Sequence, residues 1–181
     1  MSTDATYRVM FQDEAGFGRI NKPKRCWCPK GCRPAAPCQH IREYTYAYAA
    51  VSPLDGKMVS LILPRTNAEC MSLFLAEVSS RFPEEHILMV MDRAAWHTAK
   101  ALNIPDNIEL FPLLPYSPEL NPTEQIWDEV REKGFRNEVF NSLSLVEDRL
   151  CDVLADLEND HYRVQSITGW DWIVSILLNA N

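Results

Sequence analysis

The chain has 181 residues, 46% hydrophobic and 24% charged, which is typical of a globular domain with one core. Its net charge of −7 argues against a domain whose main task is gripping nucleic acid through phosphates, but leaves nucleic acid open as a substrate. No window reaches the roughly 18 apolar residues of a membrane span, and the N-terminus lacks a secretion signal. We therefore expect a cytoplasmic protein.

The first part of the chain predicts three antiparallel strands. Residues 7–11 (YRVMF) predict a buried strand that ends in an acid, Asp13, just before two glycines. Residues 44–51 and 58–63 predict two more strands, with a hairpin signal at Asp55-Gly56 between them. An acid at the end of a buried strand is costly unless it is partnered or binds a cation, so Asp13 is a candidate site residue.

Residues 19–40, between the first two strands, lack any periodicity and predict an irregular insertion rich in Cys, Pro and basic side chains. Four cysteines lie within thirteen residues of it, and in a reducing compartment such crowding favours zinc over disulfides. Their spacing lacks the paired C-x2-C knuckles of structural zinc sites, so reduced thiols are the favoured interpretation and zinc the alternative. The four are Cys26, Cys28, Cys32 and Cys38.

The middle of the chain predicts alternating helices and strands. Asn67 can cap a helix that ends near Arg81, and residues 86–91 (HILMVM) predict a buried strand that delivers a second acid, Asp92. A short helix over residues 94–102 and a strand over residues 107–114 follow.

A proline-rich loop then leads into a helix that carries a third acid, Glu124. Asn121 suits the N-cap and Pro122 the first helical position, so Glu124 falls where a capping box places its acid. This stretch alone leaves a capping role and a site role equally open. A further helix is predicted over residues 144–158, with Leu145 and Leu150 among its buried side chains, and a helical tail over residues 160–181.

This order of elements predicts an α/β fold, in which a mixed sheet of three antiparallel and then parallel strands is flanked by helices. We expect one domain over residues 1–181. Carboxylates at strand ends and on an adjacent helix can hold two divalent ions, and oxygen ligands favour magnesium or manganese.

Three blocks carry a resemblance to a known family. Asp13 in FQDEAGF, Asp92 in MVMDRAAWH and Glu124 in LLPYSPELNPTEQIW resemble the blocks of the DDE transposases of the IS630/Tc1/mariner superfamily. The resemblance implies an RNase H-like fold and a metal-binding catalytic triad made of these three acids. It also implies auxiliary roles for three further residues, His97, Glu14 and Arg93, the last standing where the family usually has Asn.

The resemblance further implies a polynucleotidyl transferase with two magnesium or manganese ions that cuts transposon ends and joins the 3′-OH to target DNA, with TA as the expected target. Expected partners are DNA, a second copy of the chain in a homodimer, and a separate N-terminal helix-turn-helix region. We expect the protein to act at the nucleoid of a prokaryote. The alternative is an inactive or regulatory fragment that dimerises with a full-length or DNA-binding partner. An RNase H or Holliday-junction nuclease is disfavoured by the third block.

Overall fold

The computed structural model describes residues 6–20, 24–92, 101–115 and 117–179. Five strands form one mixed sheet in the order β3-β2-β1-β4-β5, with β1 in the centre. β1, β2 and β3 pair antiparallel, whereas β4 runs parallel to both β1 and β5. This confirms the predicted α/β class and mixed sheet. The strands are β1 (Thr6–Gly18), β2 (Tyr44–Val51), β3 (Met58–Leu63), β4 (Glu85–Met91) and β5 (Ile108–Pro112).

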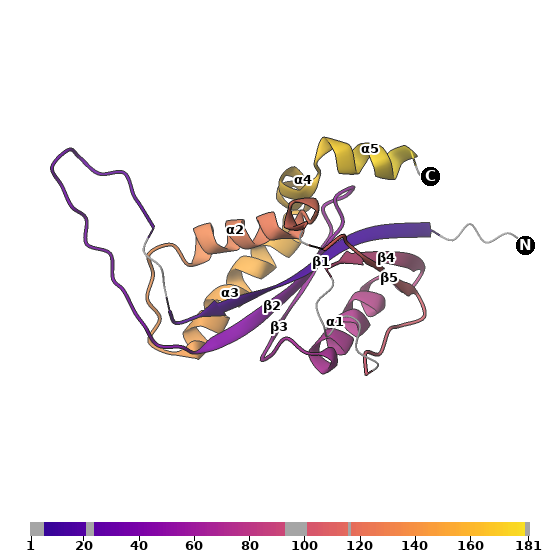
Figure 1. The fold of residues 1–181 in the computed structure, drawn as a ribbon, viewed down its shortest axis with the longest axis horizontal. Coiled ribbons are helices and arrows are strands. Elements are labelled where there is room, and N and C mark those ends of the chain that lie inside the picture. Colours follow the sequence, from indigo (N-terminus) through magenta and orange to yellow (C-terminus); the bar gives the residue numbers. More distant parts are fainter. Residues whose placement is uncertain (1–5, 21–23, 93–100, 116, 180–181) are drawn as a thin grey trace, which may run out of the picture.

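Helices cover both faces of the sheet, as Figure 1 shows. The helix on one face, α1 (Ala68–Arg81), is the helix that was predicted to follow Asn67. The Asn67 side chain caps it by accepting a hydrogen bond from the Cys70 backbone N–H at 2.8 Å. The predicted helical tail is present as two short helices. The helices are α1 (Ala68–Arg81), α2 (Thr123–Gly134), α3 (Leu143–Asn159), α4 (His161–Thr168) and α5 (Asp171–Asn179), with a short 3-10 turn η2 (Pro118–Leu120) before α2.

Alternation along β1 divides the buried residues into two cores. Met10 belongs to the core beneath α1, whereas Phe11, Ala15 and Phe17 belong to the core beneath α2 and α3. Trp127 of α2 is 1% exposed in the second core. Burying a large apolar side chain of this kind contributes about 1.5–3 kcal/mol, so α2 is firmly seated on the sheet.

The central strand is longer than the sequence suggested. Residues 7–11 were expected to form it, yet β1 continues to Gly18, so Asp13 lies inside the strand and pairs with Ala49. The reason lies in the partner strand, because Gly16 and Gly18 pair with Tyr46 and Tyr44. A Cβ atom at Gly18 would come within 2.6 Å of the Tyr44 ring, so the glycine makes room for that ring and extends the sheet.

Two smaller expectations need correction or lie out of reach. Leu145 was predicted to be buried in α3, but it is 46% exposed, whereas Val146 and Leu150 face the core. Most of the helix predicted over residues 94–102 falls outside the described residues. Within the described part of the chain, none of the helices combines the length and the apolar character needed to cross a bilayer.

Candidate active site

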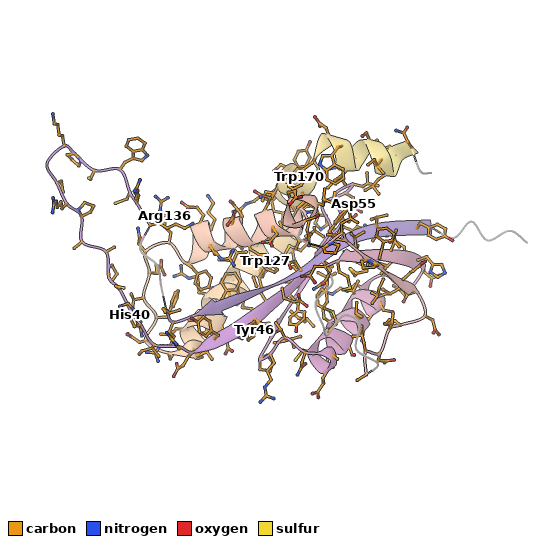
Figure 2. The ribbon with its side chains drawn as sticks, viewed as in Figure 1. His40, Tyr46, Asp55, Trp127, Arg136 and Trp170 are labelled. Atoms are coloured by element: carbon orange, nitrogen blue, oxygen red, sulfur yellow. The ribbon has the colours of Figure 1, made fainter. Side chains whose placement is uncertain are left out.

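Asp13 is the centre of the candidate site. It is half-buried and, two residues from both Phe11 and Ala15 along β1, it faces the core covered by α2. The indole Nε1–H of Trp127 donates a hydrogen bond to Asp13 Oδ2 at 2.8 Å. Figure 2 shows Trp127 between α2 and the sheet. A buried donor of this kind fixes the orientation of the carboxylate.

Two buried hydrogen bonds attach the start of α2 to the same strand. The Thr123 hydroxyl donates to the Phe11 carbonyl oxygen at 2.8 Å, and Asn121 Nδ2 donates to the Gln12 carbonyl oxygen at 2.9 Å. These two carbonyls belong to the two residues that directly precede Asp13. The two bonds therefore fix the position along β1 of the first turn of α2, which carries Glu124.

The predicted capping box at this helix is wrong. Pro122 holds the N-cap position, and Asn121 Oδ1 accepts a hydrogen bond from the Thr123 backbone N–H at 3.2 Å. Within the described part of the chain, the Glu124 carboxylate makes no capping hydrogen bond. Asn121 thus accepts a hydrogen bond at the start of α2, whereas the carboxylate of Glu124 interacts electrostatically with Asp13.

The electrostatics of the pair are unfavourable without a cation. Burial, the largest cause, together with the negative charges of Glu124 and Glu14, raises the pKa of Asp13 to about 7, although the Trp127 hydrogen bond lowers it. A carboxyl group that is half protonated near neutral pH, beside a second carboxylate, is poised to exchange its proton for a metal ion.

The third predicted acid, Asp92, directly follows β4 and is exposed. β4 pairs parallel with β1 up to Phe11 opposite Val90. Extending this register by two residues brings Asp92 level with Asp13, and alternation gives it the face of Val90, which belongs to the α2 core. By this extrapolation, Asp92 follows the strand next to the one that holds Asp13 and would share its face of the sheet.

A divalent cation fits the chemistry of this donor set. Asp13 and Glu124 are hard oxygen donors whose mutual repulsion a cation would remove. Among the described residues, however, no three His, Cys, Asp or Glu side chains come close enough to share a metal ion. Two acids are thus electrostatically coupled, and the third is near them by register alone.

Of the remaining predicted residues, those that the structure describes are not gathered at this site. Glu14 is the next residue after Asp13 in β1, so its side chain points to the opposite face of the sheet. His97 and Arg93 lie outside the described residues. The four cysteines of the insertion are exposed, unpaired thiols that are not brought together around a metal position, since the described residues hold no such group. They are Cys26, Cys28, Cys32 and Cys38.

The sequence reasoning missed the side chains that hold the acids in place. Neither Trp127 nor Thr123 was among the candidate site residues. The signal was the indole in the third block, one helical turn after Glu124, because a buried Trp needs an acceptor for its N–H. Gln12 was also missed: it is fully buried beside Asp13, and neither of its amide atoms has a hydrogen-bond partner among the described residues.

Comparisons with known proteins identify the family of the chain. The family described as "DDE superfamily endonuclease" matches residues 8–146. The "Uncharacterized protein y4pE/y4sA" of Sinorhizobium fredii (strain NBRC 101917 / NGR234) is 33% identical over 130 residues, which cover 71% of this chain and 96% of that protein.

Solved structures of the Mos1 mariner transposase share the fold. The paired-end complex with Mn superposes with a TM-score of 0.62 at 19% identity, covering 93% of this chain and 55% of that chain. The complex with Mg gives a TM-score of 0.59 at 21% identity, with coverage of 93% and 55%. The chain thus spans a little over half the length of the Mos1 chains. The chain therefore shares the fold of the Mos1 mariner transposase, and it belongs to the DDE superfamily endonucleases.

Proposed function

We propose that this chain is the catalytic domain of a DNA transposase, which cuts phosphodiester bonds at transposon ends and joins the freed 3′-OH to target DNA. The observation that carries the proposal is the half-buried carboxyl of Asp13, bonded to Trp127 and coupled to Glu124. Membership of the DDE endonucleases supports the reaction class. The Mos1 complexes with transposon-end DNA, Mn and Mg support DNA as the substrate and divalent ions as cofactors.

Asp13, Asp92 and Glu124 would hold two magnesium or manganese ions. Bound there, the ions supply charge that activates the attacking oxygen and stabilises the leaving one. The chain's own residues set the geometry. The Trp127 N–H donates to Oδ2 of Asp13 and leaves Oδ1 to bind a cation, which requires the carboxyl group to be ionised.

The reaction has two steps. In the first, a water oxygen bonds to phosphorus and gives up its proton, while the bond from phosphorus to the 3′ oxygen breaks and that oxygen leaves as the 3′-OH. In the second, the 3′-OH attacks a target phosphodiester in line, its proton is lost, and the target strand's own 3′ oxygen leaves. The target dinucleotide we expect is TA. We expect the protein to act as a homodimer together with a helix-turn-helix DNA-binding region.

The test replaces the acid that register brings beside Asp13. Asp92→Asn should abolish magnesium-dependent cleavage of transposon-end DNA while the circular dichroism melt stays that of the parent. Asp106→Asn is the matched control, because Asp106 is an exposed acid after which β5 begins, and it should cleave normally. Full cleavage by Asp92→Asn would overturn the triad.

A second candidate function is a regulatory subunit that dimerises with an active transposase and does not cut DNA. It is favoured by the absence, among the described residues, of a group of three side chains able to share a metal ion. Mixing the chain with transposon-end DNA, magnesium and a helix-turn-helix half separates the two candidates. Cleavage that Asp92→Asn removes supports the catalytic domain, and dimers without cleavage support the regulator.

A further inference from the structure

The insertion between β1 and β2 forms a projecting arm, visible on the left of Figure 1, which we call the basic arm (residues 24–42). All residues from 24 to 38 are exposed, so the basic arm adds nothing to either core. A Pro29–Cys32 turn with Gly31 at a φ of 87° presents Lys30 to solvent. A segment that costs conformational entropy without burying surface is expected to serve binding.

Charge is strongly segregated onto the basic arm. It contains five of the chain's 18 lysines and arginines and none of its 25 acids. The basic arm therefore carries +5, and the rest of the chain, with 13 bases against 25 acids, carries −12. A body of that charge repels a polyanion, and the basic arm is the described segment that can offset the repulsion.

Most of these charges are not neutralised by the body. Lys24 shares the Glu132 carboxylate with Arg136, at 3.7 Å for the lysine. In the described part of the chain, no acidic side chain pairs with the other four basic residues of the arm, which are Arg25, Lys30, Arg33 and Arg42. Unpaired, exposed cations on an extended segment suit the spaced phosphates of a nucleic-acid backbone.

The base of the basic arm is held to the helix that carries Glu124. Asn137, just after α2, has a left-handed φ of 55° and accepts from the Lys24 backbone N–H at 2.8 Å. Its Nδ2 donates back to the Lys24 carbonyl at 3.3 Å, and Arg136 donates to the Arg25 carbonyl at 3.2 Å. Figure 2 shows Arg136 at this junction and His40 on the returning part of the arm.

These contacts set the distance from the site to the basic arm. From Asp13 to Gly18 the strand advances about 17 Å, and from Glu124 to Gly134 the helix advances about 15 Å. DNA phosphates along one strand are about 3.4 Å apart along the axis, so a DNA strand that followed β1 would reach the base of the arm about five nucleotides from the scissile bond. The seven residues from Lys24 to Lys30 reach up to about 25 Å further.

We propose that the basic arm is a phosphate-binding site, which holds the DNA backbone five or more nucleotides from the bond being cut. This rests on the proposed function, in that DNA is the substrate. Binding through Arg25, Lys30, Arg33 and Arg42 would be independent of base sequence and sensitive to salt. The basic arm thus supplies the positive charge that the −12 body lacks.

The test compares two variants of equal net charge. Lys30→Gln with Arg33→Gln removes two charges from the basic arm, and Arg65→Gln with Lys133→Gln removes two exposed charges from the body. Affinity for a random-sequence 30-base-pair duplex is measured by fluorescence anisotropy across a salt series. The arm variant should bind about tenfold more weakly at 0.1 M salt, with a slope of log K against log salt smaller by about 2, whereas the body variant keeps the parent slope.

Further outcomes separate the basic arm from the proposed function. Equal slopes for both variants, with cleavage by the parent intact, would overturn the phosphate site and leave the transposase standing. A reduced slope in the arm variant, with no cleavage by the parent at any metal concentration even when the helix-turn-helix half is added, would support the phosphate site and overturn the enzyme. If the arm variant instead loses a dimer in sedimentation without DNA and keeps its slope, the arm binds the acidic face of a second copy and the proposal is wrong.

Discussion

Asp13 lies half-buried in the central strand of the sheet, whereas every residue from 24 to 38 in the basic arm is exposed. Around Asp13, packing against Trp127 and two buried hydrogen bonds at the start of α2 hold the acid where burial makes its charge costly. In the basic arm, a few contacts at the base, from Asn137 and Arg136, orient a segment that has no hydrophobic core of its own. Chemistry depends on rigid placement, while charge attraction tolerates a loose one.

The largest expected effect comes from removing the central carboxylate. Asp13→Asn should lower metal-dependent DNA cleavage by more than about a hundredfold, above the range for residues that only support a metal ligand. The same change should raise the melting temperature at pH 7.5, because it removes a half-buried charge from beside Glu124. Cleavage kinetics and calorimetry on one preparation measure both effects. A loss of activity accompanied by a loss of stability would mean that Asp13 is structural.

Removing only the indole donor should have a smaller effect. Trp127→Phe keeps an aromatic ring in the core but loses the hydrogen bond to Asp13, and we expect cleavage to fall about 10–100-fold. Trp170→Phe is the control, because its indole donates to the Ile167 carbonyl in the helical tail and not to an acid. If the two variants cleave equally well, the indole does not position the carboxylate.

The pKa of Asp13 predicts a pH dependence of stability in the metal-free protein. The folded state keeps its proton up to a pH of about 7, whereas the unfolded state loses it near 3.8. The folded state therefore binds more protons in this window, and this group's contribution to stability falls as pH rises from about 4 to 7 and levels off above it.

The measurement is the difference in free energy of unfolding between the parent and Asp13→Asn, taken by urea titration at several pH values. The variant should gain on the parent across this window, and a saturating divalent ion should remove the gain by stabilising the parent. A difference that does not change with pH would show that burial does not perturb Asp13.

The smallest effect is expected where the basic arm meets α2. Asn137→Gly tolerates the positive φ but loses the amide that bonds Lys24 on both sides, which is worth about 0.5–1.5 kcal/mol per bond. DNA affinity should fall about threefold with an unchanged salt slope, because all the charges remain. Anisotropy gives both quantities, and a smaller slope would mean that Asn137 itself contacts phosphate.

The fold was largely predictable, because hydrophobic periodicity and turn residues are local signals. Residues 44–51, 58–63 and 86–91 were predicted as strands and are strands, and Asn67 caps its helix as expected. Gly16 and Gly18 were read as residues that end the first strand, so the extension of β1 was not predictable. The tyrosines that pair with these glycines in β2 lie almost thirty residues away along the chain. Pairing between strands decides such positions.

For the site, the sequence by itself determined three candidate acids, because Asp13, Asp92 and Glu124 stand in blocks that resemble one family. It left open whether Glu124 caps its helix or serves the site. Only the tertiary structure shows that Asn121, and not Glu124, accepts a hydrogen bond at the start of α2, and that Glu124 lies close enough to raise the pKa of Asp13. Local sequence patterns predict which residues form a helix or a strand. The burial of a side chain and its hydrogen-bond partners depend instead on segments more than a hundred residues apart in the chain.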